Sequence, residues 1–179
     1  MVSTRERVRV AWCVVAGEPA DLIVASSDAL ERFAASAAEL GVVVEATRYP
    51  EGTRTAVHAA AAVGCDVAQI VKSLVLTGPD GPVLVLTSGA SKVDVDALAG
   101  VLGGDTRMAT ADEVRAATGY AIGGTPPFGH PAPLRTLIDP ALLGHDEVYA
   151  AAGTPDSCFP LTPARLVEAT GAAGADIFV

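Results

Sequence analysis

A single lysine inside an apolar run is the first residue of this chain that could do chemistry. Lys72 lies within residues 69–76 (QIVKSLVL), a stretch typical of a β-strand. With the two-residue period of a strand, its side chain lies on the same face as Ile70, Leu74 and Leu76. An ammonium group on such a face is costly unless it is paired with another group or used.

Two interpretations of Lys72 follow from the strand. The chain contains only two lysines, Lys72 and Lys92, against ten arginines, so arginine supplies most of its positive charge. A lysine inside the strand then suggests a need for a compact, single-point ammonium. Alternatively, the strand lies at a sheet edge and the side chain reaches water. The strand alone favours neither interpretation.

Two loops rich in small residues could bind a substrate. In residues 123–131 (GGTPPFGHP), glycines allow backbone amides to approach a carboxyl, carbonyl or phosphate closely, and prolines fix the loop shape. An ordinary connection has the same composition, and composition alone favours it. Residues 150–156 (AAAGTPD) leave space for a substrate or form a plain turn, which is the commoner case. No Gly-Lys-Ser/Thr follows the first loop, so it is not a P-loop.

The histidines and cysteines form no recognisable catalytic or metal motif. His58, His130 and His145 lack ligand spacing, so we expect no metal and no cofactor. His130 is the best candidate histidine because of its loop. It could pair with Cys158 as base and nucleophile, but a buried structural cysteine fits better. Without a Gly-x-Ser-x-Gly motif, a hydrolase of this sequence would use water or part of its substrate as the nucleophile.

Composition limits the classes of function. The 179 residues are half hydrophobic, which suits one domain with a sizeable core. A net charge of −9 argues against broad electrostatic binding to DNA or another nucleic-acid backbone, although a local pocket for a strand end stays open. Three widely spaced cysteines without a CxxC pair indicate no disulfide framework, so a reduced cytoplasm fits best.

The first 25 residues are expected to form an extension of uncertain role, before a working domain at residues 26–179. Arg5, Arg7 and Arg9 precede a short apolar run at residues 10–17, as in a weak signal peptide. That run is too short to span a membrane. A translation start assigned too early, or an extra peripheral strand, fits better than export, and we expect no membrane partner.

Capping and turn residues divide the rest into alternating short elements. Capping-box pairs occur at Asp28/Glu31, Asp66/Gln69 and Thr110/Glu113, and residues 78–81 (GPDG) form a hairpin turn. The expected helices cover about residues 29–40, 55–63, 94–102, 110–118 and 162–170. The expected strands cover 42–49, 69–76, 83–87, 134–138, 147–152 and 176–179. Hairpins mixed with helices favour an α+β fold over regular βαβ winding.

Motifs in a fixed order carry a resemblance to a known family. The chain resembles the aminoacyl-tRNA deacylases of the YbaK/ProX type, which are related to the editing domain inserted in bacterial prolyl-tRNA synthetases. The match runs from about residue 28 to the C-terminus. It rests on these segments: TRTA at 53–56, AVGC at 62–65, QIVKSL at 69–74, LTSG at 86–89, TGY at 118–120, GGTPPFGH at 123–130, ID at 138–139, AG at 152–153 and TGA at 170–172.

The resemblance implies a fold, a reaction and a set of residues. The fold is α+β, with a mixed, barrel-like β-sheet and surrounding short helices. The reaction is hydrolysis of the ester that joins a wrong amino acid to the 3′ acceptor end of a tRNA, without metal or cofactor and with the terminal ribose hydroxyl helping to position water. Lys72 matches the family's required lysine and is the expected catalytic residue. The expected substrate-binding residues are Thr53, Ser73, Ser88, Gly89, Gly123, Gly124, Pro127, Phe128, Gly129, His130, Ala152 and Gly153.

A synthetase gains only about 1–3 kcal/mol from one methylene when it distinguishes two amino acids, so it attaches some wrong ones. A separate pocket that hydrolyses the wrong ester has a clear physical purpose. The acidic charge favours contacts limited to the acceptor end, or delivery by a partner aminoacyl-tRNA synthetase. Two other classes stay open: a non-catalytic module that binds aminoacyl ends or amino acids, and a hydrolase of small acyl esters. Retention of Lys72 and of the loop at 123–130 speaks against the first, and activity on a minimal ester alone would indicate the second. The sequence does not name the amino acid.

Overall fold

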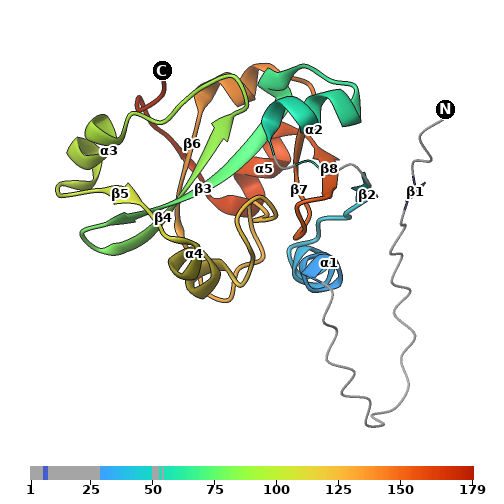
Figure 1. Cartoon of the computed structure of the whole chain (residues 1–179), viewed down its shortest axis with the longest axis horizontal. Helices are drawn as coiled ribbons and strands as arrows, with labels where there is room; N and C mark the ends of the chain where they lie inside the picture. Colours follow the sequence, from blue (N-terminus) through green and yellow to red (C-terminus); the bar gives the residue numbers. More distant parts are fainter. Residues whose placement is uncertain (1–5, 8–28, 50–52, 54) are drawn as a thin grey trace, which may run out of the picture.

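The centre of the molecule is one mixed β-sheet with short helices around it (Figure 1). The computed structural model describes residues 6–7, 29–49, 53 and 55–179. Among the described residues, eight strands follow the order β1-β2-β8-β7-β3-β4-β6-β9, and a ninth, β5, pairs with β3 beside this path. The predicted α+β class is confirmed. The expected cap Asp28, the motif residue Arg54 and most of the predicted extension lie outside the described residues.

The elements are short, apart from one long hairpin. The strands are β1 Glu6–Arg7, β2 Thr47–Arg48, β3 Ile70–Gly78, β4 Gly81–Ser88, β5 Arg107–Met108, β6 Arg135–Ile138, β7 Val148–Ala151, β8 Ser157–Leu161 and β9 Ala173–Gly174. The helices are α1 Ala29–Glu39, α2 Ala56–Val63, α3 Val95–Leu102, α4 Ala111–Thr118 and α5 Pro163–Thr170, with 3-10 turns at Val67–Gln69 and Pro140–Gly144.

Local capping sets the helix ends where the sequence predicts them. The Thr55 side chain accepts a hydrogen bond from His58 N at the start of α2, and Gly64 ends that helix in the left-handed region, with φ 85°. The capping box predicted at Thr110 and Glu113 is present at the start of α4. These ends need only neighbouring residues, which is why the sequence predicts them well.

The hairpin of β3 and β4 leaves part of one sheet edge open. β3 pairs with β4 along nearly its whole length, from Val71↔Ser88 to Gly78↔Gly81. On its other edge, β7 pairs only with residues 70–71 and β5 only with residues 76–77. Within the described part of the chain, no strand pairs with residues 72–75 on that edge. The sheet therefore has a gap beside Lys72.

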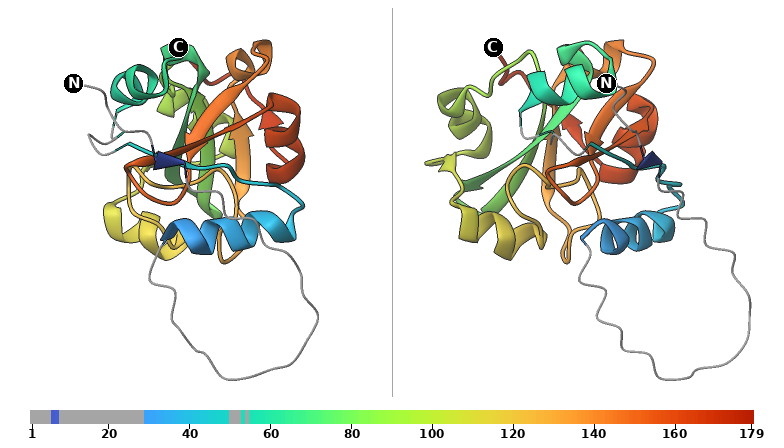
Figure 2. Two further views of the ribbon diagram at one scale, coloured as in Figure 1. Left: turned by 90° about the vertical axis from the view of Figure 1, so that its right-hand side faces the viewer. Right: turned by 45° about the vertical axis from the view of Figure 1, so that its right-hand side comes forward.

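Two apolar clusters occupy the two faces of the sheet. Leu84 and Leu86 of β4 belong to the larger cluster, which contains Phe33 of α1. Val83 and Val85 belong to the other cluster, beneath α3. This alternation is the two-residue period of a strand that is buried on both faces. Figure 2 shows α1 and α5 beside the sheet in two further views.

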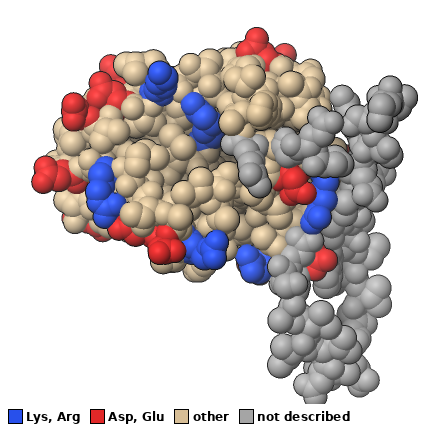
Figure 3. Space-filling model, in the orientation of Figure 1, with Lys and Arg blue, Asp and Glu red and all other residues tan. Residues whose placement is uncertain are grey.

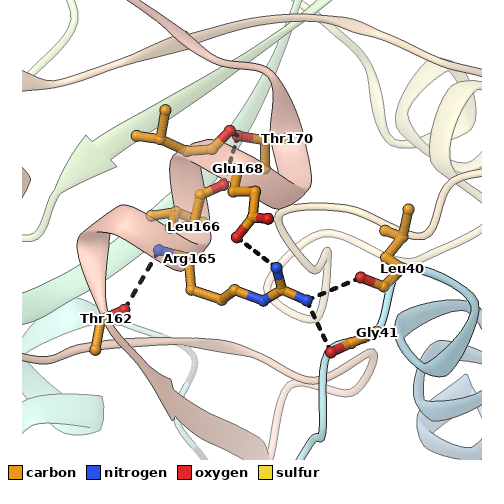
Figure 4. A network of polar contacts seen from close by, with 8 residues as sticks. Leu40, Gly41, Thr162, Arg165, Leu166, Glu168 and Thr170 are labelled. Atoms are coloured by element: carbon orange, nitrogen blue, oxygen red, sulfur yellow. Dashed lines mark hydrogen bonds and ion pairs between the residues drawn. The ribbon is translucent and has the colours of Figure 1, made fainter.

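An arginine ties α5 to the end of α1 (Figure 4). Arg165 Nη2 donates to Leu40 O at 2.9 Å and to Gly41 O at 2.7 Å. Its other terminal nitrogen pairs with Glu168. The carbonyls after a helix lack intrahelical partners, so this contact satisfies two of them and fixes the two helices against each other.

Three features differ from the predictions. Residues 42–49 do not form a full strand: only Thr47–Arg48 enter the sheet, although Val42, Val44 and Ala46 are buried alternately. The strand β8 was not predicted. The expected strand at 176–179 is wrong, because β9 lies at 173–174 and the last residues bond instead to residues 92–94, with Lys92 N 2.6 Å from Val179 O.

Two residues of the predicted extension enter the sheet. Glu6–Arg7 pair antiparallel with Thr47–Arg48, so β1 is an outer strand. Among the helices described between residues 29 and 179, none is long and apolar enough to cross a membrane.

Candidate active site

A cavity of about 460 Å³ lies beside the gap in the sheet. Its walls come from α2, residues 70–75 of β3, α4, the loop residues 122, 123 and 125, β7 and β8. Most of the lining side chains are aliphatic, and Lys72 is the one ammonium among the described residues that line it. A mainly apolar hollow with a few converging polar groups is the usual form of a small-molecule site.

The Lys72 ammonium is held by main-chain carbonyls at one wall of this cavity. Its Nζ donates to Ser91 O at 2.5 Å and approaches Gly89 O at 3.5 Å. Burial lowers the pKa of the Lys72 amine, while the negative Asp139 carboxylate partly opposes that effect. The strand has an open edge here, as one interpretation required, but the half-buried Lys72 lines the cavity and its ammonium is bound to carbonyls.

The carbonyls that hold Lys72 belong to a rigid turn after β4. Ser88 N donates to Asp139 Oδ2 at 3.1 Å, and Asp139 is only 3% exposed. Ser88 Oγ donates to Ala68 O at 2.9 Å. A Cβ on Gly89 would lie 2.1 Å from Val67 O, so only glycine allows this approach. Ser88 and Asp139 thus position the turn from behind.

Ser73 also lines the cavity, next to Lys72 along the chain. Its Oγ is buried and has no hydrogen-bond partner among the described residues. A buried hydroxyl without a partner costs free energy, so the wall of the cavity at Ser73 is not optimised for stability alone.

Thr53 and Cys158 form the neighbouring wall. Thr53 Oγ1 donates to Pro155 O at 2.9 Å, which fixes this buried side chain. Burial raises the pKa of the Cys158 thiol to about 11. The thiol is therefore protonated at neutral pH and is a poor nucleophile. This argues against the alternative pairing of Cys158 with His130.

The glycine- and proline-rich loop divides into two parts. Gly123 lines the cavity, as does Thr125. Gly124 packs behind them: a Cβ there would lie 2.8 Å from the Thr154 carbonyl carbon. Residues 127–130 turn away and line a separate hollow of about 290 Å³.

That second hollow is built around aromatic packing. The Phe128 ring is buried, 5.3 Å from the Phe33 ring and 6.0 Å from the Phe159 ring, measured between centroids. His130 Nε2 lies 3.0 Å from Pro126 O. Burial lowers the pKa of His130, so its ring is neutral at pH 7.

The small residues after β7 also lie behind the cavity wall. Gly153 has φ 99°, and a Cβ on it would lie 2.5 Å from Ala29 O. Ala152 is fully buried, while Ala151 reaches the cavity. This pair joins α1 closely to the end of β7.

The structure thus gathers five of the predicted site residues around one cavity: Thr53, Lys72, Ser73, Gly89 and Gly123. It places the other eight outside the lining: Ser88, Gly124, Pro127, Phe128, Gly129, His130, Ala152 and Gly153. A direct role for any of them in substrate binding stays a prediction.

Sequence reasoning missed an apolar rim. Val57, Met108 and Ile122 line the cavity and are 63%, 50% and 59% exposed. They come from α2, β5 and the loop after α4, and nothing in their local sequence shows that they converge. Figure 3 shows Lys and Arg as separate spots on one face of the molecule, without a continuous basic patch. Among the described residues, no three His, Cys, Asp or Glu side chains gather as a metal site.

Comparisons with known proteins agree on one family. The family model described as the aminoacyl-tRNA editing domain matches residues 50–169. YwhH of Bacillus subtilis strain 168 is 31% identical over 125 residues, which is 69% of this chain and 80% of that protein.

Two crystal structures are similar to the whole domain. One is of a proposed trans-editing enzyme for prolyl-tRNA synthetase, with 45% identity, a TM-score of 0.81, and coverage of 84% of this chain and 97% of the other. The other is of protein APE2540, with 30% identity, a TM-score of 0.75, and coverage of 83% and 99%.

Proposed function

This chain belongs to the aminoacyl-tRNA editing domain family, and on that premise we propose that it is a trans-editing deacylase. The reaction is hydrolysis of the ester between a wrong amino acid and the 3′-terminal adenosine of a tRNA. The observation that carries the proposal is the position of Lys72, which lines an aliphatic cavity of about 460 Å³ inside the matched domain and whose ammonium is held by main-chain carbonyls.

The cavity has the parts that ester hydrolysis needs. Its aliphatic walls exclude bulk water and receive the acyl side chain. The Lys72 ammonium supplies a fixed positive charge, which holds a carbonyl oxygen or the terminal phosphate. A charge placed in advance in a water-poor site stabilises the negative oxygen that develops in the transition state.

The nucleophile in this proposal is water. The Cys158 thiol stays protonated because its pKa is raised, and Thr53 Oγ1 is bound to a carbonyl. Neither side chain is prepared to attack the ester. The terminal ribose hydroxyl of the tRNA lies next to the ester in any bound substrate and helps to position that water.

The tRNA partner contacts the protein through its acceptor end. The net charge is −9 and the basic residues in Figure 3 are scattered, so a large tRNA footprint is unsupported. The apolar rim of Val57, Met108 and Ile122 offers a surface for the terminal nucleotide. Delivery by an aminoacyl-tRNA synthetase, in the cytoplasm where charged tRNA is made, completes the proposal.

The test is a single-turnover assay against a panel of mischarged tRNAs. Each tRNA is mixed with excess protein, and release of the amino acid is compared with spontaneous hydrolysis. We expect at least one small, uncharged amino acid to be released well above the spontaneous rate. Hydrolysis of a minimal acyl ester with none of any charged tRNA would contradict the proposal.

A further inference from the structure

One residue of β3 turns its main-chain polar groups toward the gap in the sheet. In an antiparallel pair, alternate residues bond to the partner strand. Gly89 N donates to Ile70 O at 2.7 Å, and a two-residue turn closes the hairpin at Gly78↔Gly81. Even-numbered residues of β3 therefore bond to β4. The N–H and C=O groups of odd-numbered residues face the other edge.

On that edge, the neighbours of Ser73 are paired and Ser73 is not. Val71 pairs with Ala150 of β7, and Val75 O accepts from Ala109 N at 3.1 Å. Among the described residues, none bonds to Ser73 N–H, C=O or Oγ. Since Ser73 lines the cavity, its unpaired N–H and C=O point toward the space where a substrate would lie, while its Oγ is enclosed behind that wall.

We propose that the aminoacyl group of the substrate completes the ladder at Ser73. Its α-ammonium donates to Ser73 O, and its ester carbonyl oxygen accepts from Ser73 N–H. An aminoacyl ester has the N–Cα–C=O pattern of one strand residue, whose donor and acceptor point to the same side. It therefore matches the single open position. This inference rests on the proposed function.

The ladder geometry assigns two further roles. Water adds to the carbonyl carbon, and the C–O bond to ribose then breaks to release the amino acid and the ribose hydroxyl. Ser73 N–H stabilises the oxyanion formed in between. Directly paired residues project side chains on the same face, so the substrate side chain lies next to Ser73 Oγ, between Val71 and Val75. Ser73 thus aligns the aminoacyl group and borders its side chain.

The Ser73 amide can be observed alone. Lys-Ser occurs once in the chain, at residues 72–73, so protein with carbonyl-¹³C lysine and ¹⁵N serine gives one carbonyl-filtered amide signal. The probes are 3′-deoxy-3′-(L-alanylamino)adenosine, which has a stable amide in place of the ester, and its N-acetyl derivative. Alanine is chosen because its small side chain fits any variant of the pocket. We expect the free amine to move the Ser73 proton downfield, and the acetylated probe, whose neutral N–H is a weaker donor, to move it less.

A kinetic comparison separates this inference from the proposed function. A mischarged tRNA that the protein hydrolyses is compared with the same tRNA after acetylation of its α-amino group. Acetylation replaces a charged donor with a neutral amide N–H, which weakens the hydrogen bond to Ser73 O and should slow the reaction roughly tenfold. Equal rates with an unmoved Ser73 signal would overturn the inference and leave the deacylase intact. No hydrolysis of any charged tRNA, with a shifted signal, would overturn the function and keep the subsite.

Two proline variants test the premise about the open edge. Ser73→Pro removes an N–H that no strand uses, and proline is tolerated at such edge positions. Leu74→Pro removes an N–H that bonds to β4. We expect Ser73→Pro to stay folded and lose deacylation, and Leu74→Pro to lose its cooperative melt. A folded Ser73→Pro protein that deacylates at the wild-type rate would overturn the proposal.

Discussion

The cavity beside β3 and the hollow lined by residues 127–130 both contain predicted substrate-binding residues, but their polar groups differ. Beside β3, Ser73 Oγ is unpaired and the Lys72 ammonium lies at an apolar wall. In the second region, His130 bonds to Pro126 O and Phe128 packs between two other rings. The first region has interactions left to make with a ligand. The second has used its groups to hold the fold together.

This difference predicts the largest stability effect at Phe128. Phe128→Ala should cost about 3–5 kcal/mol of unfolding free energy, because a buried ring leaves a cavity. Urea denaturation measures the cost, and Phe178→Ala, at a half-buried ring, is the matched control with a smaller loss. If the alanine variant does not fold, Phe128→Leu replaces it in the same measurement. A folded Phe128 variant that deacylates far more slowly than the wild type would contradict this account and would indicate that the loop contacts the substrate.

Asp139→Asn should change the pH dependence of activity. The Asp139 charge raises the pKa of Lys72 against the effect of burial, so its removal lowers that pKa further. The ammonium is lost as pH rises through the pKa, so the basic limb of the rate profile should move to lower pH. The exposed Asp96→Asn is the control. A basic limb that stays in place would show that another group titrates there.

His130 should affect stability and leave catalysis unchanged. Burial lowers its pKa in the folded protein, so the unfolded chain binds more protons between that pKa and about 6.5. The stability that the neutral His130 ring contributes is complete above about pH 6.5, and it is lost as pH falls through the pKa of the folded state. His130→Gln should therefore lose less melting temperature between pH 7 and pH 5 than the wild type. The exposed His58→Gln should behave as the wild type, and identical losses in all three would contradict this account.

The smallest expected effect concerns salt. If only the acceptor end is bound, few phosphates are neutralised, and the slope of log affinity against log salt should be shallower than about −2. Binding of an uncharged tRNA at several salt concentrations measures this slope. A slope expected for six or more phosphates would reveal a basic surface that the net charge of −9 does not suggest.

Local signals in the sequence predicted most of the fold. The caps at Thr55 and Thr110, and the hairpin around residues 78–81, depend on neighbouring residues and were correct. The strand β8 was missed although it pairs with the neighbouring β7, because its short sequence contains a proline. The terminal strand was misplaced, because β9 pairs with β6, which is distant along the chain.

The same limit applies to the site. Ser73 and Gly89 are near Lys72 because one hairpin joins β3 and β4, so the motif order was enough to group them. The rim of Val57, Met108 and Ile122 and the inward packing of Phe128 depend on tertiary contacts. The unpaired edge at Ser73 depends on where β7 and β5 end, which no local pattern records.

The two lysines of this chain provide the most direct test of the central claim, that deacylation takes place at Lys72 in the β3 cavity. Lys92 is exposed and is the matched control. In single-turnover hydrolysis of one mischarged tRNA, Lys72→Ala should be about 10²–10³-fold slower, the cost of losing one preorganised group that stabilises an oxyanion. Lys72→Arg should also be slow, because its guanidinium is larger and planar.

Lys92→Ala should keep the wild-type rate, and Lys72→Ala should melt at or above the wild-type temperature, since it removes a desolvated charge. A folded Lys72→Ala protein that deacylates as fast as Lys92→Ala would contradict the account.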